Sequence, residues 1–501
     1  MKPNNAPLFG PALVFLAVLT ALSGLATYVV AHGYTNAYAI SNWAKTIAIT
    51  DSNDFRLEYF GLGYPHVPFY ALVPFHLIPF LDSPLAPHFV SSAAAAMMMT
   101  AAYRDARQYG YSRGWSLALL GVIGMNSLFL WAASAGTQLT ISMAIYYWIA
   151  KSISEIPGRV NLNAYIKLGL LLAILFFVDG GSIYVVAGLA ITVPLLMHQS
   201  ISDRAPAGFY LIVFMPFGIA ALSWVYLNWL FFLDPFYFLK SGDSAFIGAW
   251  EVSMYVDWLV RYGGEFFAPL IVGAVIGVVL FPALPYLLYY SARKDYMLQT
   301  VIVVLLPPFL ATGFSTFTNF SETPYQFLHL LIPGIAATLV FFGRAGKPVG
   351  YGVLAMLAVG ALLSWPRMEY YPPSKDVAGW SRAVRGETLD FGQEGQVRLG
   401  KWLAEHRGPT LLDDNGAYHV IAARGDGNGL ILPFMNGFKL NLLYREVRAE
   451  FIVLPSPATV TGKKNKVNQR FPDFYEKGMK GYSLAYDEMG WRVYRHTARP
   501  A

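Results

Sequence analysis

Cysteine is absent from this chain. None of the 501 residues is a cysteine, which excludes disulfide bonds, thiol nucleophiles, iron–sulfur clusters and zinc sites built from thiolates. The sequence also contains no Walker loop, no GxGxxG stretch, no HExxH and no GxSxG, and no internal repeat of fixed period is visible. The usual signatures of nucleotide binding, zinc proteolysis and serine hydrolysis are therefore missing.

Charge is also scarce. Charged residues make up 13% of the chain, against roughly 25% in an ordinary soluble domain. Hydrophobic residues reach 55% and aromatic residues 16%, and many apolar runs approach the roughly 20 residues that cross a bilayer. We predict a polytopic α-helical membrane protein with about 11–13 spans. Its first apolar run, residues 11–31, is too long for a signal peptide and predicts an uncleaved span.

The scarce charge is concentrated at one end. Residues 366–501 hold 20 of the 36 basic and 15 of the 30 acidic residues, so we predict a transmembrane domain over 1–365 and a separate soluble α/β domain over 366–501. Helices are expected over 396–407 and 417–423. Strands are expected near 411–412, 430–433 and 450–454, with a hairpin over 482–494. The net charge of +6 gives no argument for a nucleic-acid partner.

Basic residues in the remaining loops predict the topology. Twelve of the sixteen fall in alternate loops that we assign to the cytoplasm. Loops 33–66 and 226–266 and the C-terminal domain then face outside, as in a multi-pass protein of a bacterial inner membrane. An odd number of crossings requires that the Pro-rich segment 69–81 be short, broken or half-inserted.

The first outer loop contains a cluster of acids. Asp51, Asp54 and Glu58 would share one face of a helix, and ionised groups at a membrane face mark a site by default. A partly desolvated carboxylate suits a general base. Two carboxylates, Asp51 and Asp54, could instead hold a divalent metal such as Mg²⁺ or Mn²⁺. A solvated amphipathic helix is the simplest alternative.

Two short stretches resemble the GT-C superfamily of membrane glycosyltransferases. The residues 66–70, His-Val-Pro-Phe-Tyr, are similar to a motif at the second span of aminoarabinose and mannosyl transferases of this superfamily. Residues 228–238, Asn-Trp-Leu-Phe-Phe-Leu-Asp-Pro-Phe-Tyr-Phe, resemble a second loop motif. Many spans followed by a small extracytoplasmic domain also fit. One position departs: the family commonly has an acid directly after the first span, and this chain has Asn36.

The resemblance implies a reaction. Such enzymes transfer a sugar from a polyprenyl-phosphate donor to a glycan, lipid or protein acceptor at the outer face, with a carboxylate as base. Asp54, supported by Asp51 and Glu58, is the candidate for the acid missing at Asn36. Candidates for binding substrate are Arg56, Tyr59, Tyr64, His66, Asp179, Lys240, Arg261, Glu322, Gln326 and His329.

Two other classes of function remain open. A transporter or flippase would bury ionisable groups near the midplane of the membrane and show paired broken helices, whereas most acids here lie in outer loops. A non-catalytic GT-C-like scaffold in an envelope-glycan assembly is suggested by Asn36. The donor sugar and the acceptor cannot be read from the sequence.

Overall fold

The computed structural model describes residues 9–52, 64–157, 160–197, 205–236, 267–292, 297–318, 331–344, 346–370, 375–390, 392–444 and 449–497. Contacts divide the chain into two units. Unit 1 comprises Met1–Asn36, His88–Trp224 and Trp250–Leu389, and unit 2 comprises Ala37–Pro87, Val225–Ala249 and Asp390–Ala501.

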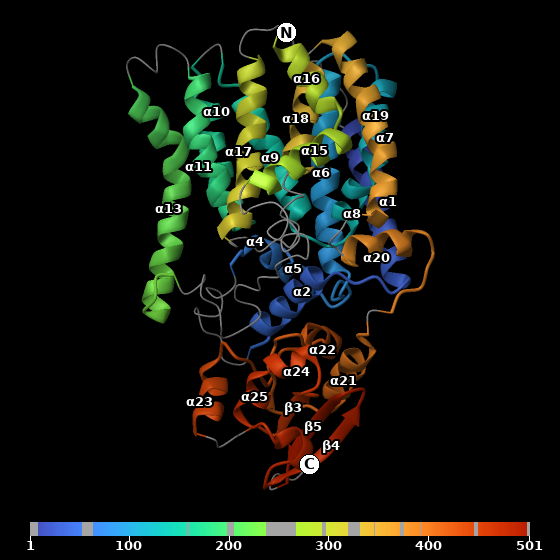
Figure 1. Cartoon of the computed structure of the whole chain (residues 1–501), viewed down its shortest axis with the longest axis vertical. Coiled ribbons are helices and arrows are strands. Elements are labelled where there is room, and N and C mark those ends of the chain that lie inside the picture. Colours follow the sequence, from blue (N-terminus) through green and yellow to red (C-terminus); the bar gives the residue numbers. More distant parts are fainter. Residues whose placement is uncertain are drawn as a thin grey trace. The chain divides into compact units, whose positions relative to one another are not determined.

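Unit 1 is helical (Figure 1). Its helices are α1 (Phe9–Ala31), α6 (Ala86–Gln108), α7 (Arg113–Gly124), α8 (Ser127–Ser134), α9 (Leu139–Ile153), α10 (Leu162–Phe176), α11 (Ser182–Thr192), the 3₁₀ helix η1 (Val193–Leu196), most of α13 (Pro206–Phe232), α15 (Phe267–Leu280), α16 (Ala283–Ser291), α17 (Met297–Thr318), α18 (Leu331–Arg344), α19 (Lys347–Tyr370) and α20 (Lys375–Val384). Helix α20 runs across the direction of α1 and α19 (Figure 1).

Three described helices are long and apolar enough to cross a membrane, over Gly10–Ala31, Pro206–Phe231 and Lys347–Pro366. Helices α7 and α8 make a fourth span if the pair, bent by 79°, counts as one. The bend has a local cause, because the Asn126 side chain accepts the backbone N–H groups of Leu128 and Phe129 and starts a new helix. These helices support a multi-pass membrane protein, and the count of 11–13 spans stays a prediction.

Unit 2 combines three helices from the segment Ala37–Pro87 with the C-terminal domain. It contains α2 (Ala37–Thr50), α4 (Val67–Tyr70) and α5 (Val73–Leu77). The last two, of four and five residues, confirm that the Pro-rich segment is broken. The helix α2 was not expected, since we treated residues 33–66 as a loop. It buries Ile40 and every residue from Trp43 to Ile49, so its second half is enclosed on all sides.

The C-terminal part is an α/β domain, as predicted. Five strands, β1 (Thr410–Leu411), β2 (Leu430–Ile431), β3 (Phe451–Pro455), β4 (Tyr482–Glu488) and β5 (Trp491–His496), form one sheet in the order β2-β1-β3-β5-β4. The first three pair in parallel and the hairpin β4–β5 is antiparallel. The helices are α21 (Glu394–Glu405), α22 (Tyr418–Arg424), α23 (Asn436–Tyr444), α24 (Val460–Lys464), α25 (Lys466–Arg470) and α26 (Phe474–Lys477).

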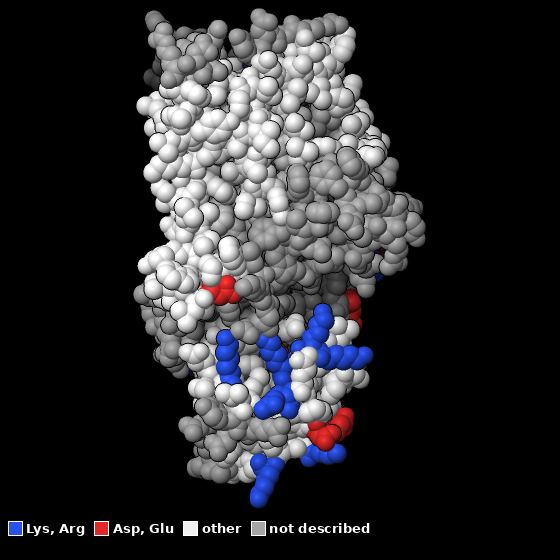
Figure 2. All heavy atoms as spheres, turned by 60° about the vertical axis from the view of Figure 1, so that its left-hand side comes forward, with Lys and Arg blue, Asp and Glu red and all other residues white. Residues whose placement is uncertain are grey.

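The distribution of charge over the surface agrees with the composition. On the face shown in Figure 2, most of the coloured Lys, Arg, Asp and Glu side chains gather in the lower part, which the C-terminal domain forms, and the described atoms of the upper part are white. The predicted domain boundary at 365/366 stays a prediction, and helix α20 belongs by its contacts to unit 1.

Candidate functional site

Most residues singled out in the sequence lie outside the described ranges. These are Asp54, Arg56, Glu58, Tyr59, Lys240, Arg261, Glu322, Gln326 and His329. The structure describes the other four, Asp51, Tyr64, His66 and Asp179. It also shows two ionisable clusters, one in each unit, that we did not anticipate.

The first cluster joins Asp51 to His76 and Asp82 in unit 2. Asp51 follows the last turn of α2, and its Oδ1 lies 3.0 Å from His76 Nε2. His76 Nδ1 lies 2.9 Å from Asp82 Oδ1. Both ring nitrogens face carboxylate oxygens, and only the imidazolium has two N–H donors, so the geometry requires a protonated ring. We call this set the histidine cluster.

The electrostatics of the histidine cluster agree with its geometry. The pKa of His76 is raised to about 9, chiefly by the hydrogen bond to Asp51. Burial lowers this pKa, and the hydrogen bond to Asp82 and the negative charges of both carboxylates raise it further. The His76 side chain is only 6% exposed. His76 is therefore a fixed cation at neutral pH, and it neutralises part of the charge of two carboxylates.

Asp51 also links α2 to the C-terminal domain. Its Oδ2 accepts the backbone N–H of Gly427 at 3.0 Å, a residue just beyond α22. A Cβ at position 427 would lie 2.6 Å from the Ile47 carbonyl oxygen, so only glycine permits this approach. Arg424 of α22 is buried, and the charges of Asp426 and Asp51 favour its charged form, whereas burial lowers its pKa. Asp51 thus has a structural task in unit 2.

Tyr64 and His66 belong to a group of aromatic side chains that precedes His76 in the sequence. The His66 ring, 5% exposed, stacks on Tyr70 at 5.5 Å and lies near Tyr64 and Phe69. The buried Lys45 ammonium lies 4.4 Å from the centre of the Phe69 ring, a cation–π geometry. The motif at residues 66–70 therefore forms a packed aromatic surface with one buried cation.

The second cluster lies in unit 1, where α20 meets the end of α1. Asn36 Nδ2 donates to Asp376 Oδ2 at 2.7 Å. The Tyr34 hydroxyl is also bonded to Asp376, and burial together with the negative charge of Asp376 raises the pKa of Tyr34 well above its usual value. Asn36 and Tyr34 are fully buried, whereas Asp376 is half-buried. We call this set the amide cluster.

One tryptophan is bonded to the amide cluster, and a second, from α20, is bonded to Ser134. Trp131 Nε1 donates to the Tyr34 hydroxyl at 3.2 Å, and Trp380 Nε1 of α20 donates to Ser134 Oγ at 2.9 Å. Both indoles are fully buried. Hydrogen bonds from Asn36 and Tyr34 thus join Asp376 to the segment that follows α1, where the resemblance expects an acid.

Asp179 lines a small cavity in unit 1. Its Oδ1 accepts the Gly181 N–H at 2.9 Å, which is a local turn before α11. The hydroxyls of Ser142 and Ser182, both buried, also line the cavity and have no hydrogen-bond partner among the described residues. Its volume of about 20 Å³ fits a water molecule rather than a sugar.

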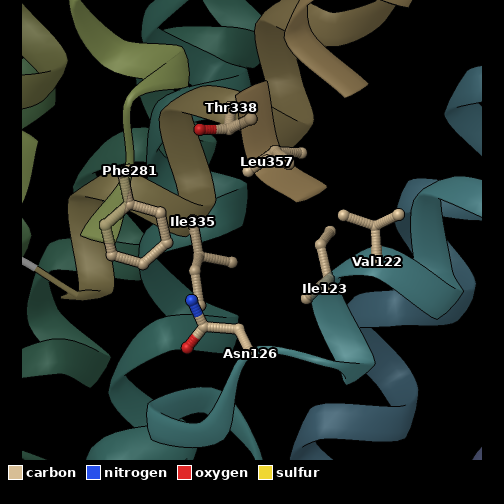
Figure 3. A pocket seen from close by; sticks show the side chains of 7 residues that line it. All are labelled: Val122, Ile123, Asn126, Phe281, Ile335, Thr338 and Leu357. Atoms are coloured by element: carbon tan, nitrogen blue, oxygen red, sulfur yellow. The ribbon is translucent and has the colours of Figure 1, made fainter. Parts of the chain in front are cut away.

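A second cavity is smaller and mostly apolar. Seven side chains line it, among them Asn126 and Thr338 as the polar ones (Figure 3). Its volume is about 10 Å³, and the Asn126 oxygen is already bonded to the start of α8. Neither cavity accommodates a donor or acceptor.

The described residues do not suit a metal ion. In this part of the chain, no three His, Cys, Asp or Glu side chains are grouped so that they could hold one. Asp51, one of the two metal candidates, faces an imidazolium, whose positive charge would repel a divalent cation. Asp54, the other metal candidate, lies outside the described residues.

Sequence reasoning missed His76, Asp82 and Asp376. A histidine and an aspartate six residues apart within an apolar, Pro-rich segment are a signal that could have indicated the first pair. No sequence signal connects Asn36 with Asp376, because 340 residues separate them.

No protein-family model matches the chain, and no curated protein sequence matches it. Solved structures do. The crystal structure of ArnT from Cupriavidus metallidurans in the apo state is similar over 98% of this chain and 98% of that chain, with a TM-score of 0.59 and 12% identity. The archaeal oligosaccharyltransferase AglB from Archaeoglobus fulgidus, in complex with an inhibitory peptide and a dolichol-phosphate, is similar over 97% of this chain and 74% of that chain, with a TM-score of 0.44 and 10% identity.

Proposed function

We propose, from the premise that this chain has the GT-C membrane glycosyltransferase fold, that it transfers a sugar from a polyprenyl-phosphate donor to an acceptor at the extracytoplasmic face. The observation that carries the proposal is the likeness to ArnT over nearly the whole of both chains. Because one fold can host several functions, the site residues need their own support.

The chemistry of such a transfer requires few protein side chains. The acceptor, a glycan, lipid or protein, attacks the anomeric carbon, and the lipid phosphate leaves. A carboxylate takes the acceptor's proton, and cations stabilise the leaving phosphate. Arg56, His66, Lys240, Arg261 and His329 are proposed for that second role.

The first outer loop is proposed to supply a carboxylate as base or metal ligand, with Asp54 foremost and Glu58 beside it. Asp51 supports that loop through its bonds to His76 and Gly427. Tyr59, Tyr64, Asp179, Glu322 and Gln326 are proposed to contact substrate.

Replacing Asp54 by Asn keeps the shape of the side chain and removes its charge. We expect turnover in a transfer assay with a lipid-linked sugar to fall on the order of a hundredfold or more, with membrane insertion intact. Titration of Mg²⁺ or Mn²⁺ after chelation separates the two roles, since a lost metal ligand raises the metal concentration required. If the Asp54→Asn, Asp51→Asn and Glu58→Gln variants all keep near-normal transfer, the first outer loop does not supply the catalytic carboxylate. A wild-type protein that transfers no sugar from any lipid donor would favour the scaffold function.

The C-terminal domain is proposed to lie outside the cytoplasm. The absence of cysteine allows single cysteines to be introduced and labelled with an impermeant reagent. We expect labelling in intact cells at Ser456→Cys and protection at Ser112→Cys. The reverse pattern would overturn this topology.

A further inference from the structure

The excess positive charge of the C-terminal domain arises in one segment, residues 427–472. Residues 366–501 hold 20 basic and 15 acidic residues, of which this segment holds seven and two, so the rest of the domain is balanced at thirteen of each. The seven basic residues are Lys439, Arg445, Arg448, Lys463, Lys464, Lys466 and Arg470, and the two acids are Glu446 and Glu450. Glu450 is paired with Arg495 at 3.1 Å.

Helix α23, in the same segment, has apolar side chains on two faces. Phe438 is buried in the hydrophobic core that contains Ile452 and Leu454. Leu440 and Leu443, which are three residues apart and therefore share a face of the helix, are 50% and 66% exposed. Singly exposed leucines are ordinary at a protein surface, so the surroundings of this pair decide its meaning.

A basic side chain lies beside the exposed leucines. Arg470 of α25 donates from Nε to the Leu442 carbonyl oxygen at 3.0 Å, and its Nη2 lies 3.5 Å from the Leu443 carbonyl oxygen. These carbonyls belong to the last turn of α23, where a helix leaves its C=O groups without partners of its own. Arg470 therefore fastens α25 to α23 and holds a positive charge next to Leu443.

Helix α24 adds two lysines to this surface. Gln469 Nε2 of α25 donates to the Lys463 carbonyl oxygen at 3.0 Å, and Lys463 and Lys464 are exposed. Val460, at the start of α24, is 72% exposed. Figure 2 brings forward the left-hand side of Figure 1, where α23 and α25 lie, and most coloured side chains of its lower part are blue. We call the surface formed by Leu440, Leu443, Val460, Lys463 and Lys464 the basic face.

We propose that the basic face docks on a lipid bilayer that contains anionic phospholipids. The exposed leucines enter the boundary between headgroups and acyl chains, and the lysines reach the phosphates with their charged ends. Each lysine near an anionic membrane surface strengthens binding about fivefold. A protein partner fits less well, because lysine is depleted at interfaces between proteins, and an anionic glycan would leave the leucines in water. The inference goes beyond the proposed function, since docking can be measured on a protein that transfers no sugar.

The absence of cysteine allows a single reporter on the basic face. Ala458→Cys, at an exposed position just before α24, carries a fluorophore in full-length protein in lipid nanodiscs, where lipids with a quencher on the headgroup report contact with the bilayer. Ser483→Cys, exposed in β4, is the reference position. In phosphatidylglycerol discs we expect quenching at position 458 and little at 483. Quenching at 458 should be lost in phosphatidylcholine discs and at high salt, which screens the charges.

Two pairs of lysines separate the basic face from charge in general. Lys463→Gln with Lys464→Gln should weaken the docking equilibrium on the order of tenfold or more. Lys477→Gln with Lys480→Gln is the matched control, because it removes two charges from exposed lysines in and just after α26. We expect the control to stay within about twofold of the wild type at physiological salt, where charges beyond about 8 Å are screened.

The leucines are tested by Leu440→Ser with Leu443→Ser. Both side chains are exposed, so we expect an unchanged thermal midpoint, weaker docking on phosphatidylglycerol discs and the same dependence on salt. Leucine variants that dock like the wild type would overturn the inference, because a surface for a soluble anion would not need them.

Three further results overturn the docking of the basic face on a bilayer. The first is equal quenching at position 458 in phosphatidylglycerol and phosphatidylcholine discs, and the second is equal quenching at positions 458 and 483. The third is a pair of lysine variants that behave alike. Soluble dextran sulfate separates the remaining anion: a response of the reporter to dextran sulfate but not to phosphatidylglycerol would reject the bilayer and assign the basic face to a polyanionic glycan.

Discussion

The two ionisable clusters hold their carboxylates through different groups. In the histidine cluster, one imidazolium bridges Asp51 and Asp82, and Asp51 also accepts the Gly427 N–H. In the amide cluster, Asn36 and Tyr34 form hydrogen bonds with Asp376. The first cluster joins the end of α2 to the C-terminal domain within unit 2, and the second joins the end of α1 to α20 within unit 1. Each cluster can be tested within its own unit.

The largest effect on stability is expected in the histidine cluster. His76→Gln leaves two carboxylates without their cation. Breaking a buried pair typically costs roughly 3–5 kcal/mol. Because Asp51 and Asp82 are 20% and 33% exposed, we expect about 2–3 kcal/mol here, measured by thermal unfolding. Sugar transfer at a temperature where the variant is folded should stay within a few-fold of the wild type.

The pH dependence gives this test a direction. The pKa of His76 is about 9 when folded and 6.5 as a free group. The stabilisation is therefore fully present below pH 6.5 and is lost as the pH rises through about 9. The stability difference between wild type and His76→Gln should shrink over that range. A constant difference from pH 6 to pH 10 would show that His76 does not act through its charge.

A smaller effect is expected at the close contact between α2 and the loop after α22. Gly427→Ala places a Cβ against the Ile47 carbonyl and within 3.2 Å of Asp51 Cβ, which we expect to cost about 1–3 kcal/mol. Hydrogen exchange in residues 418–430 should become faster. Gly437→Ala is the control, since among the described residues its Cβ would meet only Ile431, at an ordinary 3.5 Å. Equal exchange in the two variants would contradict the contact between α2 and the loop after α22.

The sequence predicted the fold well because local patterns and composition carry it. Apolar runs, the charged tail, the hairpin near Gly490 and the broken segment around Pro74 all follow from short-range periodicity and turn chemistry. The fold is similar to that of the ArnT structure over 98% of both chains. These features depend on neighbours in the sequence, so one chain is enough to reveal them.

The site was predicted less completely because it depends on distant contacts. Asn36 was recognised as the place of a missing acid, but its partner Asp376 comes from the other end of unit 1. Asp51 was recognised as a member of an acidic cluster, but its partners among the described residues are His76 and Gly427. A sequence shows which residues are costly to bury, and only the fold shows which group shares that cost.

The most direct test compares Asp54→Asn with Asp82→Asn in one series, measuring kcat and the thermal midpoint of each. Both changes remove one carboxylate charge and keep its shape. The account predicts opposite losses: Asp54→Asn should lose on the order of a hundredfold in kcat with little change in midpoint, and Asp82→Asn should lose several degrees in midpoint with kcat within a few-fold of the wild type. Equal losses of rate in both variants, or a lowered midpoint with an unchanged rate in Asp54→Asn, would contradict it.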